Sequence, residues 1–304
     1  MFRSLRLALA LFLSALALPL ISASVASASP RPGCVVSLSP TATETLFAIG
    51  AGRQVQAVDK NSDYPTTGLP TKRIDSLNPS VEAVIGICKT TASHSSKPDL
   101  VIISYDANSI KEKLAAVGVK VVDQEPALNL AGALNQIKQL GSLTGHTTTA
   151  DALAASIKST INKDVASVPK HPGKTLTAYY ELDTTYYSLT STTFVGSLLK
   201  SLGVVNIADA QSTTADAGYP QLSAEYILSA NPKMIFLADT VCCKASAATV
   251  AKRPGFSKVA AVKDGEVIGL NDSVASRWGP RLSLLMNELT ASVKGALKNP
   301  KLWK

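Results

Sequence analysis

Cysteines are the residues of this 304-residue sequence whose type and spacing most directly suggest chemistry. Cys34 opens an apolar run, Cys88 ends a segment with helical spacing, and Cys242 and Cys243 are adjacent. In an oxidising compartment disulfides are the expected state. A strand start and a helix end lie at the same edge of a parallel α/β sheet, so Cys34–Cys88 is our first choice among three possible pairings. For the adjacent pair the sequence leaves two alternatives, a strained vicinal disulfide or two reduced thiols in a turn.

Histidine is the other residue type that could bind a metal or move a proton, and the sequence has three, His94, His146 and His171. None has a carboxylate or a cysteine at ligand spacing, so we predict that all three are solvated loop residues. The GxSxG, HExxH, CxxC and GxxxxGKS/T motifs are missing from the sequence. We therefore predict no catalytic residue, no metal site and no cofactor, in a protein that is not an enzyme.

The second half of the chain repeats the order of features of the first half. The first half has a helix end at Gly50, a strand-like segment at 55–59, Tyr64-Pro65, and Pro98 opening an apolar run. The second half has Gly203, 204–209, Tyr219-Pro220 and Pro232 in the same order. Two similar units predict two lobes with a crevice between them, because ligands of open parallel sheets sit at the carboxyl ends of strands.

Hydrophobic periodicity predicts the elements that must position these residues. Strands are predicted at 35–38, 55–59, 98–104, 119–123, 175–180, 234–239 and 266–270. The first helix begins either at Ser39-Pro40 or with a capping box of Thr41 and Glu44. Between about 128 and 168 apolar residues recur only at helical spacing. A helix of about twenty residues from Thr149 would span roughly 30 Å, enough to join two lobes rigidly.

The predicted fold class is α/β, with two α/β lobes of related topology joined by one long interlobe helix and a ligand cleft between them. The predicted divisions are a signal peptide at 1–28, an N-terminal α/β lobe at 29–127, a helical linker that includes the long interlobe helix at 128–173, and a C-terminal α/β lobe at 174–304. Residues 87–96 have loop composition and are interpreted as a surface insertion of the first lobe, tied down at Cys88.

The amino end has the pattern of a secretory signal peptide. Arg3 and Arg6 precede an apolar run from Leu7 to Ile21, and we expect cleavage after Ala28. An uncleaved anchor is the weaker alternative, because the run falls short of the roughly 20 apolar residues of a spanning helix. The residues before Cys34 lack the composition of a lipoprotein cleavage box. The mature product is expected to be a soluble exported domain at the periplasmic or extracellular face of the cell envelope.

Charge and composition limit the kinds of partner that we expect. Removing the two arginines of the signal peptide takes the formal net charge from +8 to +6. The lysines and arginines are scattered and form no basic block, so we expect no nucleic-acid partner. We expect the protein to be a monomer.

Four groups of residues carry a family resemblance. They are Val35–Glu44 (VVSLSPTATE), Ser62–Pro65 (SDYP), Asn78–Glu82 (NPSVE) with Pro98–Ile102 (PDLVI), and Ser276–Arg281 (SRWGPR). Together they resemble the periplasmic-type binding proteins of cobalamin and ferric-siderophore ABC importers, over nearly all of the mature chain. The resemblance implies little hinge motion, no catalysis, and an ABC permease with its ATPase subunit as partners. The insertion at Cys88 and the Cys242-Cys243 pair depart from the usual pattern of that family.

The resemblance implies two docking residues. In that family one glutamate near a helix start in each lobe docks onto arginines of the permease, and Glu82 and Glu225 are the matching residues. The alternative is that each carboxylate only stabilises its helix start through the macrodipole. We favour docking, because the two glutamates occupy equivalent places in the repeat. Glu44 is a candidate third acid at the rim, although a capping box would also account for it.

Tyrosines are the first candidates for contact with a solute. Flat rings bind by stacking, and carboxamide or chelate oxygens bind by a few directed hydrogen bonds. Tyr64 and Tyr219 precede prolines in equivalent loops, where the family places aromatic cleft residues. The alternative is that each tyrosine packs its loop against its own lobe. Tyr105 and Tyr187 are candidates of second rank.

Two charged residues follow the last strand of the second lobe, Asp272 and Arg277. Arg277 resembles the cleft arginine of the family, and its fork of donors suits carboxamide, phosphate or catecholate oxygens. Asp272 is included among the expected ligand contacts. For Trp278, beside Gly279-Pro280, the sequence leaves two alternatives, a side chain in the cleft or a side chain in the core.

The resemblance implies a receptor that captures a corrinoid (cobalamin) or a ferric chelate and delivers it to the permease. The Ser-Asp-Tyr-Pro loop favours cobalamin, with a ferric siderophore second. Haem is third, because a tyrosine would have to serve as its axial ligand. The alternative from another class is an exported enzyme or envelope protein that reuses the fold.

Overall fold

The computed structural model describes residues 31–89 and 96–303. The predicted signal peptide, its cleavage site at Ala28 and His94 lie outside the described residues. Within the described ranges, no helix is both long enough and apolar enough to cross a membrane.

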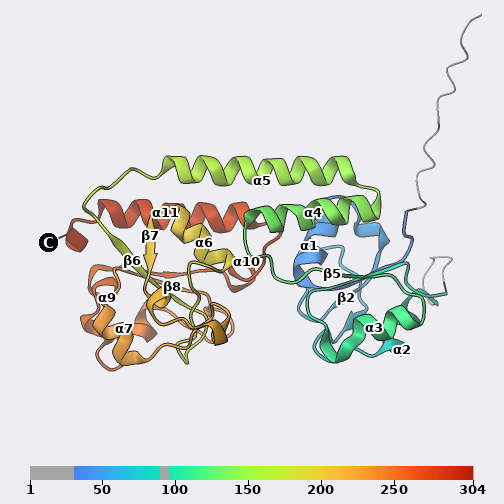
Figure 1. The fold of residues 1–304 in the computed structure, drawn as a ribbon, viewed down its shortest axis with the longest axis horizontal. Coiled ribbons are helices and arrows are strands. Elements are labelled where there is room, and N and C mark those ends of the chain that lie inside the picture. Colours follow the sequence, from blue (N-terminus) through green and yellow to red (C-terminus); the bar gives the residue numbers. More distant parts are fainter. Residues whose placement is uncertain (1–30, 90–95, 304) are drawn as a thin grey trace, which may run out of the picture. The chain divides into compact units, whose positions relative to one another are not determined.

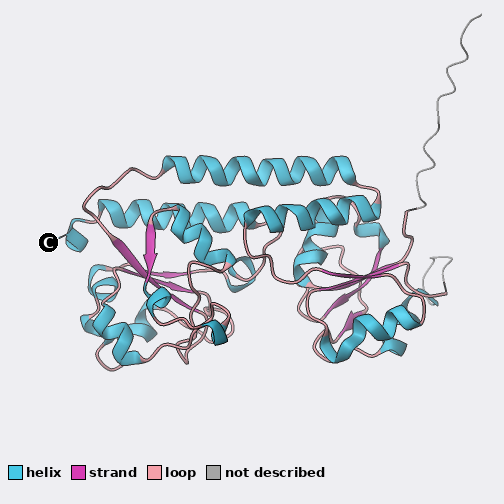
Figure 2. Ribbon diagram, in the orientation of Figure 1, coloured by secondary structure: helices cyan, strands magenta, loops and turns pink. Residues whose placement is uncertain are grey.

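The unit from Arg31 to Lys304 alternates strands and helices in both lobes (Figures 1 and 2). The first lobe contains β1 (Val35–Leu38), α1 (Pro40–Ala48), β2 (Val55–Asp59), β3 (Arg73–Ile74), α2 (Val81–Lys89), β4 (Leu100–Ile103), α3 (Ile110–Ala116) and β5 (Val121–Asp123). Two helices follow, α4 (Leu130–Thr144) and α5 (Thr147–Ser167). The second lobe contains β6 (Leu176–Glu181), α6 (Phe194–Ser201), β7 (Val204–Asn206), α7 (Ala224–Ala230), β8 (Met234–Leu237), α8 (Ala247–Ala251), α9 (Ala260–Asp264), β9 (Val267–Gly269), α10 (Asp272–Ala275) and α11 (Leu282–Lys298). Short 3-10 helices occupy Gly52–Gln54, Ala107–Ser109, Ile207–Ala210, Thr214–Asp216, Phe256–Lys258 and Pro300–Trp303.

Strand order confirms the repeat that the sequence predicts. The first sheet has the order β3-β2-β1-β4-β5 and the second has the order β7-β6-β8-β9. Every pairing is parallel. Without β3, the first order matches the second strand by strand, with β1 equivalent to β6 and β4 equivalent to β8. The carboxyl ends of equivalent strands therefore occupy equivalent places in the two lobes.

Each central strand is buried on both faces, as expected for parallel sheets covered by helices. In β4, Leu100 and Ile102 belong to one hydrophobic cluster, while Val101 and Ile103 belong to another. Alternation along a strand explains this division, because successive side chains point to opposite faces. In β8 the same alternation separates Met234 and Phe236 from Ile235 and Leu237.

The long helix α5 joins the lobes and has 21 residues, which confirms the predicted interlobe helix. It packs along α4 and α11, which lie beneath it in Figure 1. A single hydrophobic cluster contains Leu46 of α1, Ile137 of α4, Ile157 of α5, Phe236 of β8 and Leu289 of α11. Because one core runs through both lobes beneath α5, large hinge motion would expose apolar surface that is now buried.

Cys34 and Cys88 form a disulfide, in agreement with the predicted pairing. Both cysteines are fully buried in the cluster on the outer face of the first sheet. Cys242 and Cys243 are free and exposed in the structure, which corresponds to the alternative of two reduced thiols.

Serine side chains cap the helices α1, α2 and α7. Of the two starts considered for α1, the structure has Ser39-Pro40: the Ser39 side chain accepts from the Ala42 amide, and Pro40 is the first helical residue. At α2 Ser80 is the cap, because its side chain accepts from the Ala83 amide. At α7 Ser223 is the cap and accepts from the Tyr226 amide.

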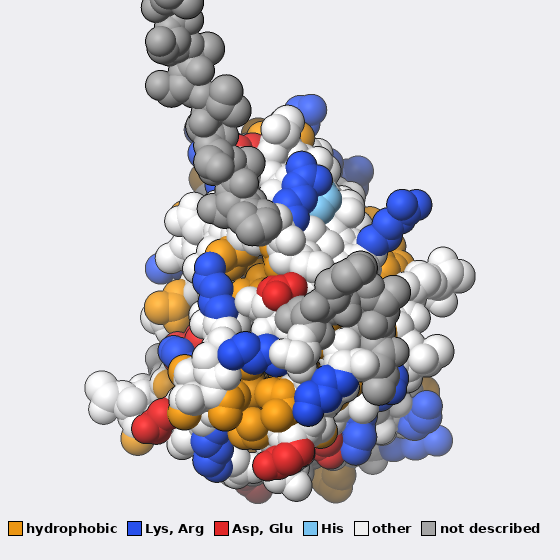
Figure 3. Space-filling view, turned by 90° about the vertical axis from the view of Figure 1, so that its right-hand side faces the viewer, with side chains coloured by type: hydrophobic (Ala, Val, Ile, Leu, Met, Phe, Trp, Pro, Cys, Tyr) orange, Lys and Arg blue, Asp and Glu red, His pale blue; other side chains and the backbone are white. Residues whose placement is uncertain are grey.

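Basic side chains on the face at the first-lobe end of the molecule are dispersed. Figure 3 shows lysines and arginines separated by acidic, apolar and uncharged side chains, with an apolar patch among them. The scattered placement in the sequence thus persists on this face of the fold.

Candidate functional site

A pocket of about 200 Å³ lies in the second lobe, beside the segment Pro126-Ala127 at the end of the first lobe. Its lining comes from several separate segments of the chain and is mostly apolar. The lining residues are Pro126, Ala127, Leu182, Leu189, Phe194, Val195, Tyr219, Ala275, Ser276, Arg277 and Trp278. The structure therefore brings together two of the predicted contacts, Tyr219 and Arg277, and leaves the others outside this lining.

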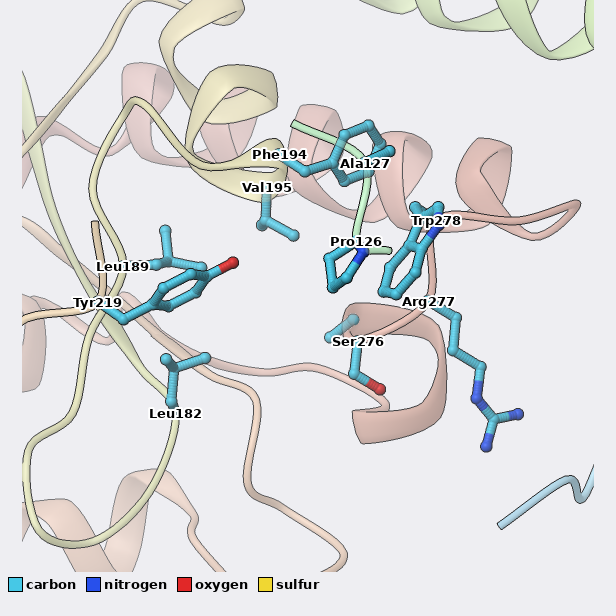
Figure 4. A pocket seen from close by; sticks show the side chains of 11 residues that line it. Pro126, Ala127, Leu182, Leu189, Phe194, Val195, Tyr219, Ser276, Arg277 and Trp278 are labelled. Carbon is cyan, nitrogen blue, oxygen red and sulfur yellow. The ribbon is translucent and has the colours of Figure 1, made fainter. Parts of the chain in front are cut away.

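Tyr219 is held by a turn that its own segment builds. The Asp216 carboxylate accepts from the amides of Thr213 and Gly218, and the Asp216 carbonyl accepts from the Tyr219 amide. Gly218 has a φ of 89°, and a β-carbon there would meet the side chains of Thr190, Thr192 and Thr193 at about 3 Å. Figure 4 shows the Tyr219 hydroxyl directed into the pocket. Partial burial raises the pKa of Tyr219 above its ordinary value, so its phenol is neutral at physiological pH.

The apolar wall comes from the start of α6. Thr193 caps the helix by accepting from the Gly196 amide, which places Phe194 and Val195 at the pocket. Gly196 lies against the Thr190 carbonyl so closely that any β-carbon would collide with it. The packing of this glycine therefore sets how far the wall projects.

Trp278 lines the pocket on the side opposite Tyr219 (Figure 4). Its indole Nε1 donates to Oε1 of Gln136 in α4 at 2.6 Å. Of the two positions left open by the sequence, the structure thus gives the cleft, although the ring also packs against the main core. The bond to α4 fixes the ring orientation.

Arg277 lines the pocket with its backbone side, while its guanidinium points away from Tyr219 (Figure 4). Its Nη1 donates to Glu44 Oε1 at 2.7 Å and to Asp63 Oδ1 at 2.5 Å, and its Nη2 donates to the Asn61 carbonyl at 2.8 Å. All three acceptors belong to the first lobe. In this structure the guanidinium therefore joins the lobes, and a direct contact with a solute stays a prediction.

Glu44 is not at the rim, so the prediction of a third rim acid is wrong. Its side chain is fully buried and accepts from Arg277 and from Nε and Nη2 of Arg281. The capping box of Thr41 and Glu44 is also wrong, because Ser39 caps α1. A buried carboxylate needs partners, and here two arginines from the other end of the chain supply them.

Tyr64 lies on the same network without entering the pocket lining. The Arg281 guanidinium lies 4.4 Å from the centre of its ring, a cation–π contact. The tyrosine is 40% exposed. Tyr64 belongs to the first lobe and Tyr219 to the second, and contact of Tyr64 with a solute stays a prediction.

Tyr105 and Tyr187 are exposed at the ends of their segments and are not in the pocket lining. Tyr105 follows β4 and is 67% exposed. Tyr187 pairs with Gln221 in an isolated antiparallel bridge beside Tyr219. Contact of either with a solute stays a prediction.

Asp272 already has partners within its own lobe. It accepts from the Thr240 hydroxyl at 2.9 Å and from the amides of Val241 and Cys242 at about 3 Å. Burial acts to raise the pKa of Asp272, but these hydrogen bonds outweigh it and hold the pKa below its ordinary value. The carboxylate thus fastens the loop after β8 to α10.

Glu82 and Glu225 occupy equivalent positions, each exposed in the first turn of its helix, α2 or α7. Ser80 and Ser223 cap these helices, so the carboxylates are not needed as caps. Both remain available to a partner. Permease docking stays a prediction.

Sequence reasoning missed the apolar half of the pocket, Leu182, Leu189, Phe194, Val195 and the Pro126-Ala127 segment. The only local signal was Thr193, a helix cap that places the next residues at the carboxyl edge of the sheet. Leu182 and Leu189 gave no signal, because an apolar residue in a loop has the same pattern whether it faces a pocket or the core.

The chain is similar to known proteins over most of its length. A family model described as "Periplasmic binding protein" matches residues 35–274. The chain is 30% identical to an uncharacterized ABC transporter substrate-binding lipoprotein, YvrC, of Bacillus subtilis, over 86% of this chain and 80% of that protein. It is 28% identical to a cobalamin-binding protein of Halobacterium salinarum, over 83% of this chain and 67% of that protein.

Solved structures share the fold. A possible iron-binding (periplasmic solute-binding) protein of Staphylococcus epidermidis superposes with a TM-score of 0.72 at 26% identity, covering 87% of this chain and 99% of that one. The periplasmic vitamin B12 binding protein BtuF of Vibrio cholerae superposes with a TM-score of 0.70 at 22% identity, covering 88% of this chain and 99% of that one. The paired sheets, the long joining helix and the family match over most of the chain lead to one conclusion: this chain belongs to the periplasmic binding protein family.

Proposed function

We propose that this protein is the extracytoplasmic receptor of an ABC importer and that it captures a corrinoid in the cleft between its lobes. The observation that carries the proposal is the pocket of Tyr219, Phe194 and Trp278, which Pro126-Ala127 at the end of the first lobe also line. Two relatives support it through their names, one an ABC transporter substrate-binding lipoprotein and one a cobalamin-binding protein.

The electrostatics of the pocket favour a solute with little net charge. Arg277 is its only charged lining residue, and Glu44 and Asp63 already neutralise that guanidinium. An anionic ferric chelate would need free cations to replace its hydration. A corrinoid presents mainly carboxamides and flat rings, which suit apolar and aromatic walls with a few hydrogen-bonding groups.

The lining of the pocket offers haem iron few axial ligands. Axial ligation of haem iron by tyrosine uses the deprotonated phenol, and burial raises the pKa of Tyr219. No histidine, cysteine or methionine is among the lining residues of the pocket. A corrinoid does not require a protein ligand, because it brings the ligands of its own cobalt.

The volume of about 200 Å³ suits one ring system and not a whole corrinoid. We infer that one end of the solute enters the pocket and that the rest lies in the open cleft. Tyr64, Tyr105 and Tyr187 are exposed and would provide contacts there. Asp272 would act indirectly, by fixing α10.

Delivery requires partners and export. We propose that Glu82 and Glu225 dock onto the permease of an importer with an ATPase subunit, and that the mature protein begins after Ala28. The protein would act as a monomer with no catalytic step.

The test is a binding comparison with purified mature protein. Isothermal titration with cyanocobalamin, a ferric catecholate chelate and haemin should give saturable binding of the corrinoid at least tenfold tighter than either alternative, a difference of about 1.4 kcal/mol. Val195→Asp places a charge in the apolar wall and should abolish binding. Val205→Asp is the matched control, because Val205 is exposed in β7 and outside the pocket lining. Tighter binding of the chelate or of haemin would reassign the solute, and no binding of any would refute the proposal.

A further inference from the structure

The loop after β8 carries two adjacent free thiols at the surface, Cys242 and Cys243. The neighbouring Cys243 thiol is the main cause that raises the pKa of Cys242 to about 12. Two adjacent thiols that are both open to solvent are accessible to an oxidant. The buried cysteines Cys34 and Cys88 already form a separate disulfide.

The thiol loop is fastened to the pocket through one carboxylate. The amides of Val241 and Cys242 donate to Asp272 at 3.0 Å and 2.9 Å, and the Thr240 hydroxyl donates to it at 2.9 Å. Asp272 is the first residue of α10. The last residue of that helix, Ala275, is part of the pocket lining.

The same short helix also reaches the first lobe. The Ser273 hydroxyl donates to Asp63 at 3.0 Å, and Arg277, two residues beyond α10, pairs with Asp63 and Glu44. A shift of α10 would therefore alter both the pocket wall and the contact between the lobes.

Closing a disulfide between adjacent cysteines changes the backbone of the loop. A trans peptide holds neighbouring Cα atoms 3.8 Å apart, which is below the usual range of about 4.4–6.8 Å for a disulfide. The ring that such a disulfide closes contains the amide nitrogen of Cys243. In the structure this amide donates to the Asp239 carbonyl at 3.2 Å. Twisting this peptide breaks that bond and turns the adjacent Cys242 amide, which Asp272 needs.

We propose that Cys242 and Cys243 are an oxidation site, that a disulfide-bearing oxidant converts them to a vicinal disulfide, and that this closure loosens Asp272 and the pocket wall at α10. The Cys243 thiol loses its proton to solvent, and its thiolate attacks a sulfur of the oxidant's disulfide and displaces the other sulfur as a thiolate. The neighbouring cysteine then loses its proton to solvent, attacks the protein sulfur of the mixed disulfide and displaces the second oxidant thiolate. The protein gives up two protons and two electrons, and the oxidant becomes two thiols.

Neither the oxidation nor the loosening of α10 depends on a bound solute. A lower affinity of the oxidised form for its solute rests on the proposed function.

The experiment uses the mature protein with Trp303→Phe, which leaves Trp278 as the single tryptophan, since the sequence has two. Oxidised glutathione is the oxidant. Alkylation and peptide mass spectrometry count the free thiols, and acrylamide quenching follows Trp278 in the pocket. We expect the loss of both alkylatable thiols in one monomeric product, together with increased quenching of Trp278 that a mild reductant reverses.

Two variants test whether the change in Trp278 quenching requires the two cysteines and whether it acts through Asp272. The double variant Cys242→Ser/Cys243→Ser should show no response to glutathione. Asp272→Ala should show increased quenching without oxidant, because it removes the clamp directly. Formation of only mixed or intermolecular disulfides would overturn the oxidation site, and ring closure without a change in Trp278 quenching would overturn its link to the pocket. Neither readout contains a solute, so failure of the proposed function would appear only in the separate titrations.

Discussion

Arg277 and Glu44 form an ion pair of 2.7 Å although they are 233 positions apart in the sequence. Glu44 belongs to α1 in the first lobe, and Arg277 follows α10 in the second. Arg281 adds two hydrogen bonds to the same buried carboxylate. The lobes are thus joined by charge beside the pocket as well as by the core beneath α5, and both contacts oppose wide opening of the cleft.

Replacing Glu44 by Gln should destabilise the protein strongly. The change leaves two largely buried arginines without their shared anion, and loss of one partner of a buried pair typically costs about 3–5 kcal/mol. Urea unfolding followed by circular dichroism gives the free energy of unfolding. Asp75→Asn, which breaks the exposed pair with Lys60, is the matched control and should have a much smaller effect. Similar effects of the two variants would contradict the structural role of Glu44.

The buried carboxyl group of Asp239 should make the stability of the protein depend on pH. Burial, with the neighbouring Glu181 carboxylate, raises the pKa of Asp239 from 3.8 to about 7, and both of its carboxylate oxygens are buried without a hydrogen-bond partner. The folded state therefore keeps a proton that the unfolded state has released, so stability falls as the pH rises from about 4 to about 7. Asp239→Asn should remove this loss and stabilise the protein by on the order of 2 kcal/mol at about pH 8, and less at about pH 5.

Urea titrations of both proteins across this pH range check the prediction. Asp75→Asn serves as control, because a hydrogen bond from Lys60 lowers the pKa of Asp75 and the sign of its contribution is opposite. A stability difference between wild type and Asp239→Asn that does not change with pH would show that Asp239 is ionised in the folded state.

Tyr219→Ala should weaken binding of the solute by about 1–3 kcal/mol, because it removes an aromatic wall of the pocket. Tyr219→Phe keeps the ring, so it separates stacking from the hydroxyl contact and should retain most of the affinity. Tyr105→Ala, at a more exposed residue outside the lining, should have the smaller effect of the two alanine variants. Calorimetry with cyanocobalamin gives all three values. Unchanged affinity in Tyr219→Ala would move the site elsewhere.

Reversing both docking candidates, with Glu82→Arg and Glu225→Arg, should abolish uptake and leave solute affinity nearly intact. A like-charge contact would replace an attractive one in each lobe, which can cost several kcal/mol at an interface. Uptake of labelled solute in cells and calorimetry on the purified variant measure the two effects.

Glu112→Arg is the matched control for Glu82→Arg, since Glu112 is also exposed in the first turn of a helix of the same lobe, α3. Thermal midpoints of all variants must be compared, because both acids favour their helix starts by about 0.3–1 kcal/mol each. A double variant that folds, binds solute and supports normal uptake would rule out docking by these glutamates.

Removing the Cys34–Cys88 bond by a double change to Ala should lower the free energy of unfolding by about 4 kcal/mol. The disulfide closes a loop between residues 54 positions apart, and cross-linking a loop of that length lowers the entropy of the unfolded chain. Guanidinium unfolding of the variant and the parent gives the difference. The parent treated with a strong reductant should approach the value of the variant, and a stability unaffected by either treatment would contradict the contribution of the bond.

The sequence by itself determined the framework of this protein. Strands, helix ends and the long α5 follow from local hydrophobic periodicity, because burial on one or two faces imposes a period that neighbouring residues reveal. The order of these features, repeated in the two halves, was enough to predict two related lobes. The Cys34–Cys88 pairing followed from the same framework, since topology puts a strand start and a helix end at one edge of a sheet.

Only the tertiary structure decided what the charged residues do. Glu44 has a sequence context that fits a capping box, and Arg277 has one that fits a free cleft cation, yet they pair with each other. Asp272 likewise satisfies the amides of Val241 and Cys242. The partner of an ion depends on which distant segments meet when the lobes pack, and a local sequence pattern contains no information on that meeting. The pocket lining from Pro126 to Trp278 has the same origin, because an apolar side chain is marked as a wall of a site only by the space left beside it.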